Sequence, residues 1–368
     1  MKYFIIAGEA SGDLHAANLM KEIIKKDKHA QFQFLGGDLM QDAAQLPPLI
    51  HYKQMAFMGV IDVVKNIGKI WHNLKTTRKA ISAFNPDKVI LVDYPGFNLK
   101  IAAFAHKNGY ETVYYIAPKL WAWKEGRVKK IKKYIDKLLI ILPFEKDFYH
   151  KHGVKALYVG NPVVDAVTRH KAMKRKEFFQ RFSLDERPLI ALLPGSRKQE
   201  LNMMLPVMLS IVEQFPEFQF VISGAPSFSS ADYEPFIAGK NISVIFNHTY
   251  DLLQHARAAV VTSGTAALET ALFKVPQVVV YRTDKWQYAI GKHLVKINFI
   301  SLPNLIMQRK IIPELLQNNF NPELLQKELK SLVQGNKRTK MLSDYHDLET
   351  VLGKDPASEK AARIIVET

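Results

Sequence analysis

Short runs of Val, Ile and Leu alternate along this chain with longer stretches in which apolar residues recur every three or four positions. Near-continuous apolar runs of this length are typical of parallel strands buried on both faces, and the stretches between them have the period of amphipathic helices. This order predicts β-α-β units and doubly wound parallel sheets. The expected strands are 3–7, 32–35, 88–92, 112–116, 138–142 and 156–159, followed by 189–193, 218–222, 242–246, 258–261 and 277–281.

The two series of strands indicate two domains, since 368 residues exceed one average domain. A strongly charged stretch at 169–181 separates the series, and Glu186-Arg187-Pro188 then leads into a new strand. We therefore expect two Rossmann-like α/β domains of similar size. The absence of cysteine excludes a disulfide framework and a thiolate metal site, and a hydrophobic content of 48% excludes a disordered chain.

Positive charge is concentrated in one region. The chain carries a net charge of +16, and residues 51–200 hold 29 basic and 13 acidic side chains, so the remainder is balanced. A basic surface in one region indicates an anionic partner: nucleic acid, a phosphorylated substrate or an acidic membrane surface. No run of about 18 apolar residues suggests a transmembrane span, and Glu9 follows the first strand too soon for a signal peptide, so we expect a cytoplasmic protein.

Two loops of the first half follow expected strands. Gly8-Glu9-Ala10-Ser11-Gly12-Asp13 opens onto a helical pattern, and its acidic side chains favour a sugar hydroxyl or amide over a phosphate. A tight turn with a helix cap is the alternative. Asp93 ends the strand 88–92, where open α/β sheets place ligands, although a capping Asp is the alternative. Trp121 follows the strand 112–116 and either lines a sugar-binding groove or packs in the core.

The second half contains two loops suited to phosphate. Gly195, Ser196 and Arg197 follow the strand 189–193. Ser263, Gly264 and Thr265 follow the strand 258–261 at a helix N-terminus, and Glu269, one turn further on, is placed to accept hydrogen bonds from ribose hydroxyls. Two such loops in one domain favour a nucleotide diphosphate. No Asp-x-Asp pair is present, so we expect no metal, and we assign the His150-x-His152 pair to the surface.

Residues 60–79 combine a helical apolar stripe with lysines and an arginine, and no acid lies between Asp62 and Asp87. One interpretation is an interfacial helix that docks on acidic lipid, and the alternative is an ordinary helix facing the core. In the first interpretation the side chains entering the lipid are Val64, Ile67, Ile70, Trp71 and Leu74.

Together these motifs resemble the lipid-A-disaccharide synthases, glycosyltransferases of lipopolysaccharide biosynthesis. The similarity extends in order across most of the chain. It rests on G-E-A-S-G-D at 8–13, Met58-Gly59-Val60, V-D-Y-P-G-F-N at 92–98, W-A-W-K at 121–124, L-P-F-E-K at 142–146, L-P-G-S-R at 193–197, S-G-T-A-A-L-E at 263–269 and S-L-P-N-L at 301–305.

The resemblance implies a GT-B fold, in which two Rossmann-like doubly wound parallel-sheet domains face across a cleft. It implies an acceptor domain at 1–168, a UDP-sugar domain at 169–345 and a C-terminal helix at 346–368 that packs back on the first domain. The implied reaction joins UDP-2,3-diacylglucosamine to 2,3-diacylglucosamine 1-phosphate (lipid X), with inversion, to give a β-1,6-linked disaccharide 1-phosphate and UDP.

Within this scheme we expect Asp93 to be the general base, because inverting transfer needs a base for the acceptor hydroxyl. Glu9, Ser11, Gly12, Asp13 and Trp121 are expected to bind the acceptor, with Glu9 and Asp13 as rival bases. Asn304 joins the nucleotide-binding set. We expect no cofactor, no nucleic acid and peripheral attachment to the cytoplasmic face of the inner membrane, and homodimerisation is left open.

The chain departs from the family pattern at Gly96, often Asp, at Lys119-Leu120, usually a small or polar pair, and at Asn161, commonly His. The first departure removes a rival carboxylate to Asp93. Two alternatives remain: another GT-B enzyme of UDP-sugars, such as an epimerase or an N-acetylglucosaminyltransferase, and an RNA-binding module whose basic band contacts phosphates.

Overall fold

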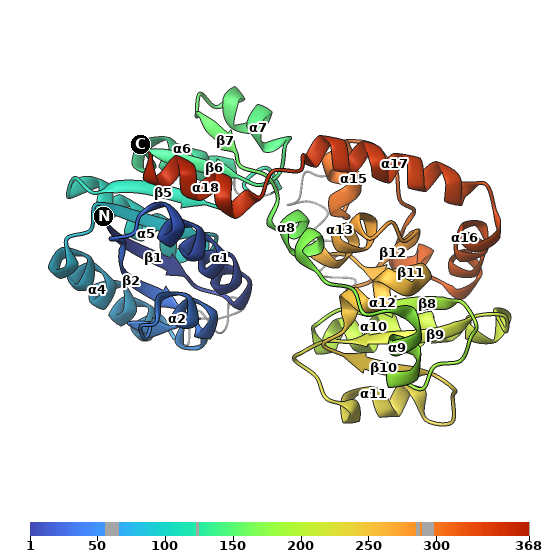
Figure 1. Cartoon of the computed structure of the whole chain (residues 1–368). Helices are drawn as coiled ribbons and strands as arrows, with labels where there is room; N and C mark the ends of the chain where they lie inside the picture. Colours follow the sequence, from blue (N-terminus) through green and yellow to red (C-terminus); the bar gives the residue numbers. More distant parts are fainter. Residues whose placement is uncertain (56–65, 123–124, 285–287, 289–297, 368) are drawn as a thin grey trace. The chain divides into compact units, whose positions relative to one another are not determined.

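The computed structural model describes residues 1–55, 66–122, 125–284, 288 and 298–367. Its contacts divide the chain into two compact units, Met1–Asp165 with Lys354–Thr368, and Ala166–Gly353. In each unit a parallel sheet is covered by helices (Figure 1). The predicted class, two doubly wound α/β domains, is therefore confirmed.

The first unit contains a seven-stranded sheet in the order β3-β2-β1-β4-β5-β6-β7. Every neighbouring pair is parallel, and β4 lies at the centre, between β1 and β5. The strands are β1 (Lys2–Ala7), β2 (Gln31–Gly36), β3 (Ile50–His51), β4 (Lys88–Val92), β5 (Glu111–Tyr115), β6 (Lys137–Ile140) and β7 (Ala156–Tyr158).

Both faces of this sheet are buried, which is why its strands are almost continuously apolar. Side chains alternate along β1: Tyr3 and Ile5 belong to one core cluster, and Phe4 and Ile6 belong to the cluster on the opposite face. The described α-helices of the unit are α1 (Ala10–Lys26), α2 (Asp38–Ala44), α4 (Ile67–Phe84), α5 (Pro95–Lys107), α6 (Val128–Tyr134), α7 (Glu145–Lys151) and α18 (Ala357–Val366), and α8 (Pro162–Arg169) leads into the second unit.

The C-terminal helix α18 completes the first unit. Ala361, Ala362 and Ile365 pack in the same core cluster as side chains of α1. The buried carboxylate of Asp165 accepts the backbone N–H groups of Ala357 at 2.8 Å and Ser358 at 3.2 Å, so it caps the start of α18. The returning segment begins at Lys354 rather than at 346, because α17 (Lys337–Leu352) is one continuous helix of the second unit.

The second unit contains a six-stranded parallel sheet in the order β10-β9-β8-β11-β12-β13. Its strands are β8 (Leu189–Leu193), β9 (Gln219–Gly224), β10 (Ser243–Phe246), β11 (Ala256–Thr262), β12 (Gln277–Tyr281) and β13 (Glu314–Leu316). Its described helices, besides α17, are α9 (Arg175–Arg181), α10 (Lys198–Leu209), α11 (Ser230–Ile237), α12 (Thr249–His255), α13 (Thr265–Leu272), α15 (Leu302–Met307) and α16 (Pro322–Gln334).

All eleven strands expected from the sequence are present, with ends that differ by a few residues. The two strands that sequence reasoning missed, β3 and β13, lie at sheet edges and contain two and three residues. Segments this short carry no detectable periodicity.

Candidate functional site

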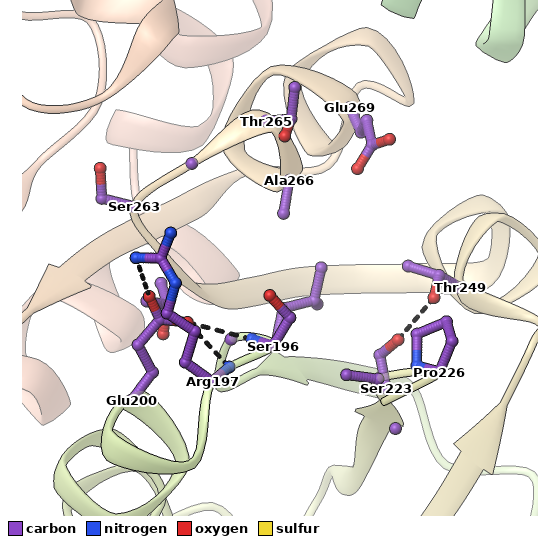
Figure 2. A pocket seen from close by; sticks show the side chains of 16 residues that line it. Ser196, Arg197, Glu200, Ser223, Pro226, Thr249, Ser263, Thr265, Ala266 and Glu269 are labelled. Atoms are coloured by element: carbon purple, nitrogen blue, oxygen red, sulfur yellow. Dashed lines mark hydrogen bonds and ion pairs between the residues drawn. The ribbon is translucent and has the colours of Figure 1, made fainter. Parts of the chain in front are cut away.

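A cavity of about 400 Å³ lies in the second unit at the carboxyl ends of β8, β9 and β11 (Figure 2). Parallel strands end at the same edge of a sheet, so the loops that follow them converge there. Seven of the eight residues predicted to bind nucleotide line this one cavity: Gly195, Ser196, Arg197, Ser263, Gly264, Thr265 and Glu269.

Sequence reasoning missed a third wall of the cavity. Ser223 and Gly224 end β9, and Ala225 and Pro226 follow it. The hydroxyl of Ser223 lies 2.7 Å from that of Thr249 at the start of α12. The signal was available, because Ser-Gly-Ala-Pro is another run of small residues at the end of an expected strand. The remaining lining residues are Leu193, Glu200, Thr262 and Ala266.

The loop after β8 is held by Glu200, in the first turn of α10. Its Oε2 accepts the backbone N–H groups of Ser196 at 3.0 Å and Arg197 at 3.3 Å. Gly195 adopts φ +103°, and a Cβ there would lie 2.4 Å from the Glu200 carboxylate, so this turn requires glycine. Because Glu200 accepts both N–H groups, the group that this loop offers to a ligand is the exposed Arg197 guanidinium, which lies 3.4 Å from Glu200 Oε1.

The loop after β11 leads directly into α13. Gly264 precedes the helix, and the first residues of α13, Thr265 and Ala266, line the cavity. The N–H groups of a helix's first turn have no partner within the helix and can bind an anion. Thr262 is 3% exposed, lines the same cavity, and its Oγ1 has no hydrogen-bond partner in the described part of the chain. Glu269 faces the cavity one turn into α13, and the hydroxyl of Tyr250 donates to its Oε1 at 2.7 Å.

Asn304, the eighth predicted residue, does not line the cavity, so that prediction is wrong. Its Oδ1 accepts the N–H groups of Ile311 and Ile312, and its Nδ2 donates to the carbonyl of Ile312 and to Glu314 Oε1. The fully buried amide therefore has all its hydrogen-bond partners within the protein, and these bonds connect α15 to the segment that follows it. Ser263 is linked to the same region, because its hydroxyl donates to the carbonyl of Ile300 at 2.9 Å.

In the first unit, Asp93 follows β4 in a left-handed conformation with φ +43°. Its backbone carbonyl accepts the Tyr114 hydroxyl at 2.6 Å and the Asn98 amide at 2.7 Å, so the backbone is fixed. Burial raises the pKa of the Asp93 carboxyl, the nearby Glu9 carboxylate raises it further, and the Lys119 ammonium opposes the shift. A carboxyl with a raised pKa at a strand end is suited to general-base chemistry.

The loop after β1 divides into exposed and buried residues. Glu9 and Ser11 are exposed, and Gly12 is buried beside Ala7. Asp13 is only 3% exposed, and its carboxylate accepts N–H groups of Gly37 at 2.7 Å, Leu39 at 3.1 Å and Met40 at 3.2 Å. Asp13 therefore caps α2, and our expectation that it binds the acceptor or competes as the base is wrong.

Trp121 is anchored by a buried acid. Its Nε1 donates to Glu145 Oε1 at 3.0 Å, and its ring packs edge-on against Phe144 with centroids 4.9 Å apart. The other Glu145 oxygen accepts the N–H of Leu142 at 3.1 Å. Burial raises the pKa of Glu145 to about 7, although the hydrogen bonds from Trp121 and the backbone lower it. In the sequence Glu145 stands out only as part of the L-P-F-E-K motif at 142–146.

We expect Glu145→Gln to flatten the pH dependence of stability in the first unit. The folded state binds the Glu145 proton more tightly than the unfolded chain, whose glutamates titrate near 4.5. Stability should therefore be lost as pH rises from about 4.5 to about 7, by about 3 kcal/mol. Chemical unfolding at pH 5 and pH 8 measures the difference, and the exposed Glu359→Gln is the control. An unchanged difference in Glu145→Gln would contradict the assignment.

The stripe on α4 is divided between the core and the surface. Leu74 is 2% exposed and belongs to a core cluster, so it does not contact lipid and that prediction is wrong; Ile70 packs against the same cluster. Ile67 and Trp71 are 57% and 63% exposed. Val64 lies outside the described residues.

No described helix combines the length and apolarity needed to cross a membrane. Likewise, within the described ranges no three His, Asp or Glu side chains are grouped as a metal site.

Solved structures with the same architecture include the UDP-GlcNAc 2-epimerase from Neisseria meningitidis bound to UDP-GlcNAc, with a TM-score of 0.71 at 12% identity over all of both chains. The glycotransferase of kitacinnamycin superposes with a TM-score of 0.68 at 10% identity, over 100% of this chain and 98% of that one. At these identities the likeness concerns the fold. The chain therefore has the GT-B fold.

The sequence comparisons identify the family. The model of lipid-A-disaccharide synthetase matches residues 3–367. The lipid-A-disaccharide synthase of Geobacter metallireducens is 35% identical over 374 aligned positions, which cover 100% of this chain and 97% of the relative. The chain belongs to the lipid-A-disaccharide synthase family, and it is a glycosyltransferase that forms the disaccharide of lipid A.

Proposed function

We propose that the chain transfers 2,3-diacylglucosamine from its UDP derivative to the 6-hydroxyl of 2,3-diacylglucosamine 1-phosphate. The products are the β-1,6-linked disaccharide 1-phosphate and UDP. The nucleotide assignment rests on one observation: seven residues that the sequence predicts to bind a nucleotide line a single cavity. Family membership supports the disaccharide product.

In the proposed donor site the diphosphate lies between Arg197 and the start of α13. The guanidinium supplies charge-assisted hydrogen bonds, and the helix N-terminus supplies backbone N–H groups and a favourable dipole. Glu269 accepts hydrogen bonds from the ribose hydroxyls. These groups neutralise the departing diphosphate with the protein's own charges and dipoles, so the proposal includes no metal and no other cofactor.

In the proposed acceptor site Asp93 takes the proton from the attacking hydroxyl. The hydroxyl oxygen bonds to the anomeric carbon as the bond to UDP breaks, and inversion follows from attack on the face opposite the leaving group. Glu9, Ser11 and Trp121 are proposed to contact the acceptor sugar. Gly12 contributes by bringing α1 close to β1.

Mass spectrometry of the product from UDP-diacylglucosamine and lipid X tests the reaction. The expected product is the disaccharide 1-phosphate, formed equally well in the presence of a chelator. An epimerised UDP-sugar with no disaccharide, or loss of activity with chelator, would contradict the proposal. UDP release with other lipid acceptors distinguishes this enzyme from N-acetylglucosaminyltransferases.

We also propose peripheral attachment to the cytoplasmic surface of the inner membrane through the start of α4. Ile67 and Trp71 project from this helix one turn apart, and the exposed Lys75 and Lys79 continue at the same four-residue spacing. An indole beside ammonium groups suits the boundary between acyl chains and anionic headgroups. Each cation near an anionic leaflet adds about 1 kcal/mol.

We expect the double variant Ile67→Ser, Trp71→Ser to lose binding to vesicles containing anionic lipid while it stays folded. Both side chains are mostly exposed, so their replacement leaves the core intact. Vesicle sedimentation measures binding, and the thermal midpoint reports folding. Leu39→Ser with Leu46→Ser, which removes two other exposed apolar side chains of the same unit, is the control. Equal vesicle binding by both double variants would overturn the proposal.

A further inference from the structure

The hydrogen bond between Tyr250 and Glu269 joins two helices behind the nucleotide cavity. Tyr250 lies on α12, next to the cavity residue Thr249, and Glu269 lies on α13. The Tyr250 hydroxyl donates to Glu269 Oε1 at 2.7 Å. In Figure 2 the Glu269 carboxylate projects from α13. Tyr250 occupies one acceptor site of Oε1 and leaves both acceptor sites of Oε2 to a ligand.

Tyr250 is itself held in place by aromatic contacts. Its ring lies edge-on to His170, with centroids 5.4 Å apart, and packs against Phe273 at 5.0 Å. His170 also contacts Phe273, at 5.9 Å. The phenol ring is therefore packed between two aromatic neighbours, which favours the orientation in which its hydroxyl meets Glu269.

The segment that carries His170 is fastened to α12. His170 Nε2 lies 3.1 Å from Asp251 Oδ1, and the backbone N–H of Met173 donates to the same oxygen at 2.9 Å. His248 Nδ1 lies 2.8 Å from the other Asp251 oxygen. The buried Asp251 carboxylate thus ties the first residues of the second unit to the helix that presents Tyr250.

We propose that Tyr250 is a positioning residue for nucleotide binding, which keeps the Glu269 carboxylate turned toward the ribose hydroxyls of the donor. This inference rests on the proposed donor site and adds a residue outside the cavity lining. Its consequence is selectivity for a nucleotide that carries both ribose hydroxyls. A nucleotide that lacks them gains nothing from the orientation of Glu269.

The ionisation state of Glu269 follows from its surroundings. Burial raises the pKa of Glu269, and the hydrogen bond from Tyr250 lowers it. Arg197 and Glu200, which form an ion pair, line the same cavity as Glu269. Behind Tyr250 lie His170 and the Asp251 carboxylate, which also contacts His248. Without the Tyr250 hydroxyl the pKa of Glu269 rises, so the carboxyl is protonated at a higher pH than in the wild type.

Calorimetric titration with UDP and 2′,3′-dideoxy-UDP tests the inference in the full chain. We expect Tyr250→Phe to bind UDP about tenfold more weakly, the size of one hydrogen bond, and to bind the dideoxy compound with less than a twofold change. In this variant the loss of UDP affinity on acidification should begin at a higher pH. Tyr345→Phe, which removes another buried hydroxyl of the same unit, should change neither affinity.

A double-mutant cycle tests whether Tyr250 affects UDP binding through Glu269. In a Glu269→Ala background, Tyr250→Phe should have little further effect on UDP affinity, because the group through which Tyr250 acts is absent. Equal weakening of UDP and dideoxy-UDP, or full additivity in the cycle, would overturn the inference and assign Tyr250 a purely structural role. Failure of the wild type to bind UDP would instead overturn the proposed donor site.

Discussion

Asp93→Asn is expected to lower turnover by about 100- to 10,000-fold, the range typical for removal of a general base. The change removes the proton acceptor and little else. Asparagine tolerates the left-handed φ of +43°, and the bonds from Tyr114 and Asn98 go to the backbone carbonyl, which remains. UDP affinity and the thermal midpoint should therefore match the wild type, and single-turnover kinetics measures the chemical step.

Glu9→Gln provides the matched comparison, because Glu9 is the other carboxylate that acts on Asp93. Its removal should lower the pKa of Asp93 and move the acid limb of the rate profile to lower pH, since a neighbouring negative charge is lost. If Asp93→Asn keeps a near-normal rate while Glu9→Gln loses turnover, the base is Glu9. Asp13 is no longer a candidate, because its oxygens are occupied at the start of α2.

Arg197→Ala is expected to weaken UDP binding by about 1.5–3 kcal/mol, which corresponds to roughly a 10- to 150-fold loss. Arg197 is the one cation among the residues that line the described cavity, so no neighbouring side chain replaces its charge. Direct titration with UDP measures the change. Arg197→Lys should recover only part of the affinity, because an ammonium cannot form a bidentate contact with phosphate.

Lys198→Ala is the control for long-range charge. Lys198 is the next residue and equally basic, but its side chain lies 3.7 Å from Asp232 and does not line the cavity. A similar loss of affinity in both variants would mean that Arg197 acts only through the general positive field. Unchanged affinity in Arg197→Ala would remove it from the donor site.

The central strands and the loops after them were predictable because burial on both faces leaves a strong signal. The limits of β4, β8 and β12 agree with those expected from their apolar runs. Parallel strands also bring their carboxyl ends together, so Gly195–Arg197 and Ser263–Thr265 were expected in one cavity although about 70 residues separate them. The same logic applies to Ser223–Pro226, which sequence reasoning overlooked.

The tertiary structure decided which of the polar candidates remain free to bind a ligand. Asp13 and Asn304 occur in motifs that resemble binding loops, but their oxygens are occupied by backbone N–H groups of Gly37, Leu39 and Met40 and of Ile311 and Ile312. On α4 the apolar period is visible in the sequence, yet only packing separates the buried Leu74 from the exposed Trp71.

By itself, the sequence of this protein determined the doubly wound architecture, the edge of each sheet at which to look for a site, and the family. Those features depend on hydrophobic periodicity and on short motifs, which are local properties of the chain. The tertiary structure alone decided that Tyr250 supports Glu269, that Glu145 anchors Trp121 and that Asp13 caps a helix. The physical reason is that a buried polar group must find its hydrogen-bond partner wherever the fold brings one, and these partners lie 19 to 24 residues away.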